Sequence, residues 1–171
     1  MEARTRLALV LVSLLGLPGV VTVARAQPGP DQKKLDYFVG KWRSDVDVKA
    51  SASSPAAKAS ALEDCEWFAN MHVVCRSEST GPAGLYKSMR VISYVPALKQ
   101  YASYTVDSIG YAVLSLGQVQ GTTWTFTTDF GGVKTRYSMK TAKDSYSAVS
   151  EYAGADGKWT TVSAVNATRA K

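Results

Sequence analysis

Residues 122–140 read TTWTFTTDFGGVKTRYSMK, and they separate apolar from polar side chains more cleanly than any other stretch of the chain. In the first half, Trp124 and Phe126 alternate with threonines. The second half alternates in the same way, with Val133, Tyr137 and Met139 on one side and Lys134, Arg136 and Lys140 on the other. Side chains of a strand point alternately to the two faces of a sheet, so this pattern predicts two strands with one buried and one solvated face.

The same kind of segment recurs along the chain from Trp42 onward. Short runs rich in Val, Thr, Tyr, Phe and Trp stand between Gly, Pro, Asp and Ser breaks, without a sustained 3.6-residue apolar period. Ten strands are predicted, at 42–50, 60–68, 71–80, 85–95, 100–107, 110–119, 122–129, 132–140, 145–153 and 158–168. Tight turns between successive strands favour an antiparallel up-and-down β-barrel, because closure removes exposed edges; a sandwich is the alternative.

Two segments outside the strands have a distinct composition. The composition of residues 31–39 predicts one short helix. Asp31 caps this helix, Gly40 ends it, and Leu35 and Phe38 form its apolar face. We expect this helix to plug one end of the barrel. Residues 50–59 are Ala, Ser, Lys and one Pro, which predicts a surface loop or, as an alternative, a lid over the barrel mouth.

The first 26 residues have the order of a secretory signal peptide. Arg4 and Arg6 precede an apolar run, and Ala24-Arg25-Ala26 supplies a small-x-small cleavage site. The run is interrupted by glycine and proline and is too short for a bilayer-spanning helix, so no transmembrane anchor is expected. We therefore expect an exported protein, periplasmic or extracellular, with one barrel domain over residues 27–171.

The charge of the chain is a modest +6, of which the predicted signal peptide accounts for +2. Without a dense run of Lys or Arg, nucleic acid is not an expected partner. Lys134, Arg136 and Lys140 form a basic ridge on one strand face, which we interpret as solvated, with an anionic docking patch as the alternative. The sequence leaves the oligomeric state open.

Cys65 and Cys75 flank a turn centred on Asn70 and therefore face each other across an antiparallel pair. Opposed positions lie within disulfide reach, and an exported compartment is oxidising, so a Cys65–Cys75 bridge is predicted. A redox or metal pair is the alternative. It lacks support from a Cys-x-x-Cys motif or a histidine cluster, and no metal site is expected.

The cysteine register also assigns faces to the neighbouring residues. Trp67 shares the inward cysteine face, whereas Asp64 and Arg76 stand opposite each other outside, as an expected cross-strand ion pair. His72 is the only histidine and falls on the outer face. It is therefore expected to be a surface residue rather than a haem ligand or buried base.

Eight of the nine tyrosines lie in predicted strands, at Tyr86, Tyr94, Tyr101, Tyr104, Tyr111, Tyr137, Tyr146 and Tyr152. Aromatic walls with hydroxyl tips suit a pocket for an apolar or aromatic small molecule. The same rings can instead simply fill the core of a small barrel. The sequence does not separate the two interpretations.

Gly40-Lys41-Trp42 resembles the Gly-x-Trp signature that opens lipocalin-like (calycin) barrels. The resemblance implies that Trp42 packs across the barrel end beneath a basic residue of the last strand, for which Arg169 is the candidate. Beyond this motif, the chain resembles the DUF1579 family of exported, lipocalin-like bacterial proteins of unassigned function. That resemblance rests on Leu35 to Trp42, Cys65 to Phe68 with Val74-Cys75, Tyr94 to Tyr101, Val106 to Gly110 and Glu151 to Trp159.

The resemblance has two exceptions. Val95 stands before Pro96 where the family pattern has Asp. Related haem-binding barrels use an inward histidine near the end of the chain, which this sequence lacks in its last half. Haem is therefore not an expected ligand, and no cofactor is predicted.

Three functions remain open at this stage. The first is an exported binding protein for a small, largely apolar or aromatic ligand, whose barrel wall includes Trp67, Trp124, Phe126 and Tyr137. The second is a cofactor-independent enzyme of isomerase, cyclase or hydrolase type, using Tyr, Asp107 or Glu151 as acid and base; no nucleophile-elbow, P-loop or triad pattern supports it. The third is an interaction module with a packed barrel, acting through the basic ridge or residues 50–59.

Overall fold

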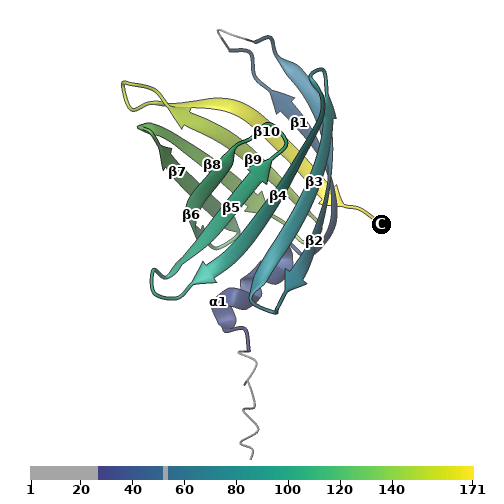
Figure 1. Cartoon of the computed structure of the whole chain (residues 1–171), viewed down its shortest axis with the longest axis vertical. Coiled ribbons are helices and arrows are strands. Elements are labelled where there is room, and N and C mark those ends of the chain that lie inside the picture. The colour runs from purple at the N-terminus through teal and green to yellow at the C-terminus, as the bar shows by residue number, and fades with distance from the viewer. Residues whose placement is uncertain (1–26, 52–53) are drawn as a thin grey trace, which may run out of the picture.

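The structure is a computed structural model that describes residues 27–51 and 54–171 (Figure 1). The predicted signal peptide, residues 1–26, lies outside the described residues. Among the described residues, no helix is long and apolar enough to cross a membrane.

Within residues 27–51 and 54–171, ten antiparallel strands form one closed barrel, in the ring order β1-β10-β9-β8-β7-β6-β5-β4-β3-β2. Their bounds are β1 (Gly40–Val48), β2 (Ala57–Phe68), β3 (His72–Gly81), β4 (Gly84–Val95), β5 (Gln100–Asp107), β6 (Ala112–Gln120), β7 (Thr123–Phe130), β8 (Val133–Thr141), β9 (Ser145–Ala153) and β10 (Trp159–Arg169). The first and last strands pair along their length, from Trp42 opposite Arg169 to Val48 opposite Ser163. The predicted up-and-down barrel is confirmed, and the sandwich alternative is wrong.

Tight hairpins between neighbouring strands make this topology possible. Ala69 and Asn70 turn the chain from β2 to β3 with φ of 52° and 58°, and Gly131 and Gly132 do the same between β7 and β8 with φ of 58° and 84°. Two successive residues with positive φ match the right-handed twist of the flanking strands. The chain can therefore reverse within two residues and pair each strand with the next.

The short helical segment closes one end of the barrel (Figure 1). It consists of α1 (Pro30–Lys33) followed directly by the 3-10 turn η1 (Lys34–Tyr37). Leu35 and Phe38 are buried among the inward side chains of the strands, so the predicted plug is confirmed. The predicted cap is wrong: Gly29 occupies the N-cap position, and Asp31 lies inside the first turn, where it accepts from Lys34 Nζ at 2.7 Å.

The predicted loop at 50–59 is longer than the observed one, because β2 already begins at Ala57 and pairs there with Val48. The other predicted strands begin and end within two residues of the observed ones. The β2 start was missed because alanine and serine carry little hydrophobic signal, although Ala57, Ala59 and Ala61 alternate on the inward face.

The predicted Cys65–Cys75 disulfide is confirmed, with the two Cα atoms 4.0 Å apart. The cysteines are paired residues of β2 and β3, and Asp64 is likewise opposite Arg76. The expected Asp64–Arg76 ion pair is nevertheless wrong, because Arg76 Nη1 reaches diagonally to Glu66 Oε1 at 2.7 Å. Asp64 instead lies 3.7 Å from Lys41 Nζ.

Large buried side chains are concentrated at the helical end of the barrel. The buried hydrophobic residues are Leu35, Phe38, Trp42, Cys65, Val73, Cys75, Ile92, Tyr101, Trp124, Phe126, Met139, Ala148 and Ala167. Close packing of these side chains around the helix makes this the closed end of the molecule.

Candidate functional site

The inward face of the barrel changes character along its length. Away from the closed end, a few inward residues are large, such as Tyr86 and Tyr152. Most of the others are small and only half-buried, although the wall surrounds them on every side. They include Ala57, Ala59, Ala61, Ser77, Ser79, Ser88, Thr105, Ser115, Thr128 and Ser150. Side chains that point inward and still contact solvent require solvent inside the barrel. We call the space above the closed end, lined by these residues, the lumen.

An ion pair lies where the lumen meets the closed end. Arg90 Nη2 of β4 donates to Glu63 Oε1 at 3.0 Å and to Oε2 at 3.2 Å on β2. The two side chains are only 20% and 17% exposed. Each is placed by the disulfide hairpin, since Arg90 pairs with Cys75 in the ladder and Glu63 lies two residues before Cys65.

Two tyrosines, Tyr137 and Tyr146, lie beside this ion pair. We call these four residues, Arg90, Glu63, Tyr137 and Tyr146, the floor of the lumen. Burial, followed by the negative charge of Glu63, raises the pKa of Tyr146 to about 12. Burial, followed by the nearby Tyr146, raises the pKa of Tyr137 still further. Burial works against the charge on Arg90, but the combined interactions with Glu63, Tyr137 and Tyr146 outweigh it, so the pKa of Arg90 is raised. At neutral pH the floor therefore holds a charged guanidinium beside two neutral hydroxyls.

The sequence analysis missed Arg90 and Glu63. The alternation that puts Cys65 inward also puts Glu63 inward, and Arg90 stands two residues before the buried Ile92. The signal was therefore present in the strand period. It was not followed, because charged strand residues usually belong to the solvated face.

The four predicted wall residues occupy different places. Trp67 lies near the helical segment, where its Nε1 donates to Asp36 Oδ1 at 2.9 Å. The ring of Trp124 packs edge-on against Phe38, with centroids 5.0 Å apart, in the closed end.

Phe126 and Tyr137 are opposite each other in β7 and β8. Phe126 is buried against the bare backbone of Gly117, where an added Cβ would lie 2.4 Å from the ring. Of the four residues, Tyr137 is the one beside Arg90 and Glu63. A role for any of the four in ligand binding stays a prediction.

Trp42 and Arg169 lie together at the closed end. The guanidinium stacks 4.1 Å above the indole ring, and it donates from Nη2 to the carbonyl oxygen of Tyr37 at 2.7 Å and from Nη1 to that of Val39. Trp42 Nε1 donates to the Phe38 carbonyl oxygen at 2.8 Å. These contacts attach the helical plug to the first and last strands.

The two carboxylates considered for acid–base chemistry, Asp107 and Glu151, lie on opposite faces of the barrel wall. Glu151 lies on the outer face, where it accepts from Arg136 at 2.8 Å, and Arg136 stacks on Trp159 at 4.3 Å. Its expected place inside the cavity is therefore wrong. Asp107 is engaged at the β5–β6 turn, where it accepts from the Tyr86 hydroxyl at 2.9 Å and from the Tyr111 backbone N–H at 2.9 Å.

Outer-face residues behave as ordinary surface groups. His72 is half-buried on this face, with Nδ1 2.5 Å from Ser93 Oγ. The basic ridge of Lys134, Arg136 and Lys140 does lie outside, but Arg136 is neutralised by Glu151. The ridge therefore presents less positive charge than its sequence indicates.

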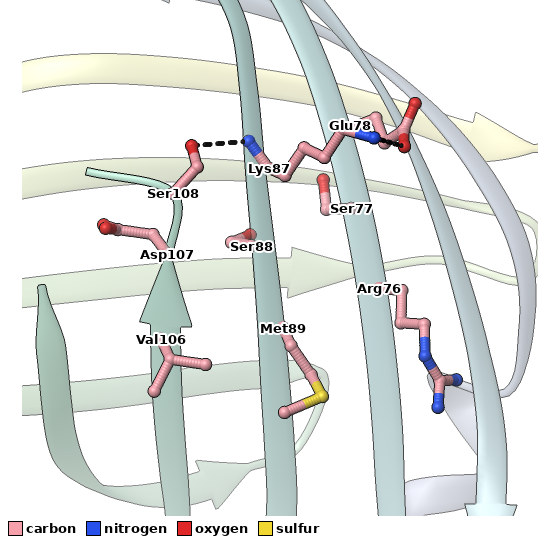
Figure 2. A pocket seen from close by; sticks show the side chains of 9 residues that line it. All are labelled: Arg76, Ser77, Glu78, Lys87, Ser88, Met89, Val106, Asp107 and Ser108. Atoms are coloured by element: carbon pink, nitrogen blue, oxygen red, sulfur yellow. Dashed lines mark hydrogen bonds and ion pairs between the residues drawn. The ribbon is translucent and has the colours of Figure 1, made fainter. Parts of the chain in front are cut away.

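A hollow of about 360 Å³ lies on the wall over β3, β4 and the end of β5 (Figure 2). Met89 and Val106 supply its apolar surface. Its polar groups already bond to one another: Lys87 Nζ lies 2.6 Å from Glu78, and the Lys87 backbone N–H donates to Ser108 Oγ at 3.1 Å. These contacts join β3 to β4 and β4 to the β5–β6 turn.

Within the described residues, one group of potential metal ligands lies close together, comprising a Glu63 oxygen and the sulfurs of Cys65 and Cys75 within 4.8 Å of one another. The sulfurs are bonded to each other, so they are not thiolates. The carboxylate is occupied by Arg90. This group is therefore not built to hold a metal ion.

The family described as "Protein of unknown function (DUF1579)" matches residues 27–169. Among solved structures, the chain is similar to Rv2717c from M. tuberculosis, with a TM-score of 0.66 and 11% identity over 84% of this chain and 99% of that one. It is also similar to the S-type phycobiliprotein lyase CPES from Guillardia theta, with a TM-score of 0.57 and 14% identity over 82% and 93%. At these identities the likeness shows the fold alone. No curated protein sequence matches the chain.

Proposed function

The chain belongs to the DUF1579 family, and from that premise we propose that it is an exported protein that binds a small, largely apolar or aromatic molecule in the lumen of its barrel. The family description carries no activity, so the proposal rests on the site. One observation carries it: large side chains fill the closed end, whereas most of the inward residues beyond Arg90 are small and half-buried.

The lining of the lumen supports the ligand class. Tyr137 offers aromatic surface at the floor, opposite the buried ring of Phe126, and the alanine, serine and threonine side chains of the wall leave room for a flat or branched organic molecule. The wall hydroxyls and the two floor tyrosines can orient such a molecule through a few hydrogen bonds. A barrel packed along its whole length, as an interaction module requires, is disfavoured by the solvent exposure of these inward residues.

Export is supported by the charge, apolar run and cleavage pattern of residues 1–26, and by the disulfide, which persists in oxidising compartments. A phycobiliprotein lyase with the same barrel is in keeping with a ligand-handling role. The lumen, rather than that likeness, carries the proposal.

Native mass spectrometry of the protein purified from its own exported fraction tests the proposal. We expect a discrete mass above that of the polypeptide, which is lost on denaturation and recovered in the organic extract, and a protein that begins at Gln27. A bare polypeptide in every preparation contradicts a carried ligand. An intact residue 1–26 segment contradicts cleavage at the predicted site.

A further inference from the structure

The guanidinium of Arg90 has hydrogen-bonding capacity that the protein does not use. An arginine side chain carries five N–H donors, and the contacts of Arg90 to Glu63 come from Nη2 alone. Within the described part of the chain, no buried side-chain nitrogen or oxygen lacks a partner. The Nε and Nη1 groups, to which no described residue offers an acceptor, are therefore in contact with solvent.

That solvent is inside the lumen. Arg90 projects inward from the middle of β4, and its Cζ lies 5.8 Å from the centroid of the Phe38 ring on the plug. Phe38 covers the guanidinium on the side of the closed end, and Glu63 holds Nη2. The unused donors are thus left on the accessible side, beside the hydroxyls of Tyr137 and Tyr146.

We propose that Arg90 binds the acidic group of the ligand, a carboxylate or a sulfonate, so that the molecule in the lumen is an organic acid standing with its acidic end on the floor. This inference rests on the proposed function, because it needs a ligand in the lumen. Hydrogen bonds between a guanidinium and an anionic oxygen are shorter and stronger than neutral ones, and a largely desolvated floor screens them little.

Glu63 has a defined part in this arrangement. Its carboxylate fixes the direction of the guanidinium and offsets the cost of an unpaired charge when the lumen is empty. The same carboxylate repels a bound anion, so Glu63 limits the affinity of the site. The two members of the pair therefore have opposite effects on the binding of an acid, which a purely structural ion pair would not have.

Two fluorescent probes with the same aromatic body separate the acid site from the lumen. The anionic probe is 8-anilinonaphthalene-1-sulfonate and the neutral probe is N-phenyl-1-naphthylamine, and each is titrated into the disulfide-bonded chain that begins at Gln27. We expect Arg90→Gln to raise the Kd of the anionic probe about ten-fold, the loss of one charge-assisted hydrogen bond, and to leave that of the neutral probe within about two-fold. Glu63→Gln should strengthen binding of the anionic probe alone.

Arg76→Gln is the matched control, since Arg76 lies on the outer face of the neighbouring strand and is paired with Glu66. This variant should leave the Kd of both probes unchanged. If the neutral probe binds and neither Arg90→Gln nor Glu63→Gln alters the anionic one, the acid site is overturned while the ligand-binding lumen stands. If neither probe binds the unaltered protein, both proposals are overturned. If near-UV circular dichroism shows that Arg90→Gln does not fold, an unchanged anionic affinity in Glu63→Gln overturns the inference.

Discussion

Arg90 and Glu63 are opposite charges held inside a barrel, where each depends on the other. Removing one partner leaves the other charge unpaired and largely desolvated, which destabilises the folded protein. Replacing both partners with apolar residues leaves no unpaired charge. We expect Arg90→Met to lower the free energy of unfolding by about 2 kcal/mol, since some solvent reaches the pair. Adding Glu63→Leu should restore most of that loss. Urea denaturation of the two variants measures both effects.

Arg76→Met is the matched variant on the protein surface, whose free energy of unfolding is compared with that of Arg90→Met. Arg76 Nη1 also bonds to a carboxylate at 2.7 Å, but its side chain is 62% exposed. Exposed ion pairs contribute little, so we expect a change below about 0.5 kcal/mol. Equal losses for Arg76→Met and Arg90→Met would contradict the placement of Arg90 in a desolvated floor.

The buried tyrosines predict a loss of stability at high pH. Burial raises the pKa of Tyr86, Tyr101 and Tyr146 to about 12 in the folded protein, against about 10 in an unfolded chain. Between these values the unfolded chain binds fewer protons than the folded one, so the free energy of unfolding falls as the pH rises from 10 towards 12. Below pH 10 the contribution of these groups is complete.

Urea denaturation at a series of pH values from 8 to 11.5 measures this dependence. Tyr146→Phe should make the decline shallower, because one of the protonated groups is removed. A decline of the same steepness in that variant would show that Tyr146 does not titrate late in the folded state.

At the scale of the element, strand alternation explains what the sequence predicted and what it did not. The β7–β8 hairpin was found because Trp124 and Phe126 contrast with threonines. The start of β2 was missed because Ala57 and Ala59 contrast little with Lys58. Arg90 and Glu63 were missed for a related reason: alternation assigns a face, but composition alone suggests that a charge belongs outside.

The β2–β3 hairpin is the element that places the lumen floor, and its disulfide predicts a measurable contribution to stability. Cys65 and Cys75 are separated by 10 residues. Closing a loop of this length in the unfolded chain corresponds to about 2–3 kcal/mol in the chain-entropy account. We expect the paired change Cys65→Ala with Cys75→Ala to lower the free energy of unfolding by that amount or somewhat more, because both sulfurs are buried.

The measurement is again urea denaturation, with far-UV circular dichroism to verify that the strands are retained. The unaltered protein reduced in its unfolded state serves as the comparison, since reduction removes the cross-link without changing the packing atoms. Stability that is unaffected in both samples would contradict a stabilising role for the bridge.

At the scale of the whole molecule, the sequence predicted closure but not how the interior is divided. Closure follows from consecutive hairpins, whose signals are local in the chain. Whether an inward residue lies in the filled end or in the lumen depends on the height of each strand in the barrel, which is set by registers such as Trp42 opposite Arg169 and Phe126 opposite Tyr137. The alternation within a single strand does not give this height, so the sequence could not show that Trp124 packs against Phe38 in the closed end.

Blocking the lumen tests the central claim most directly. Ser150 and Ser147 lie on β9, where Ser150 points inward opposite Tyr137 and Ser147 is exposed on the outer face. Binding of N-phenyl-1-naphthylamine is measured for Ser150→Trp and Ser147→Trp, with circular dichroism to verify that both variants fold. The account predicts that Ser150→Trp abolishes binding and Ser147→Trp leaves it unchanged; equal binding by the two folded variants would contradict a ligand site inside the barrel.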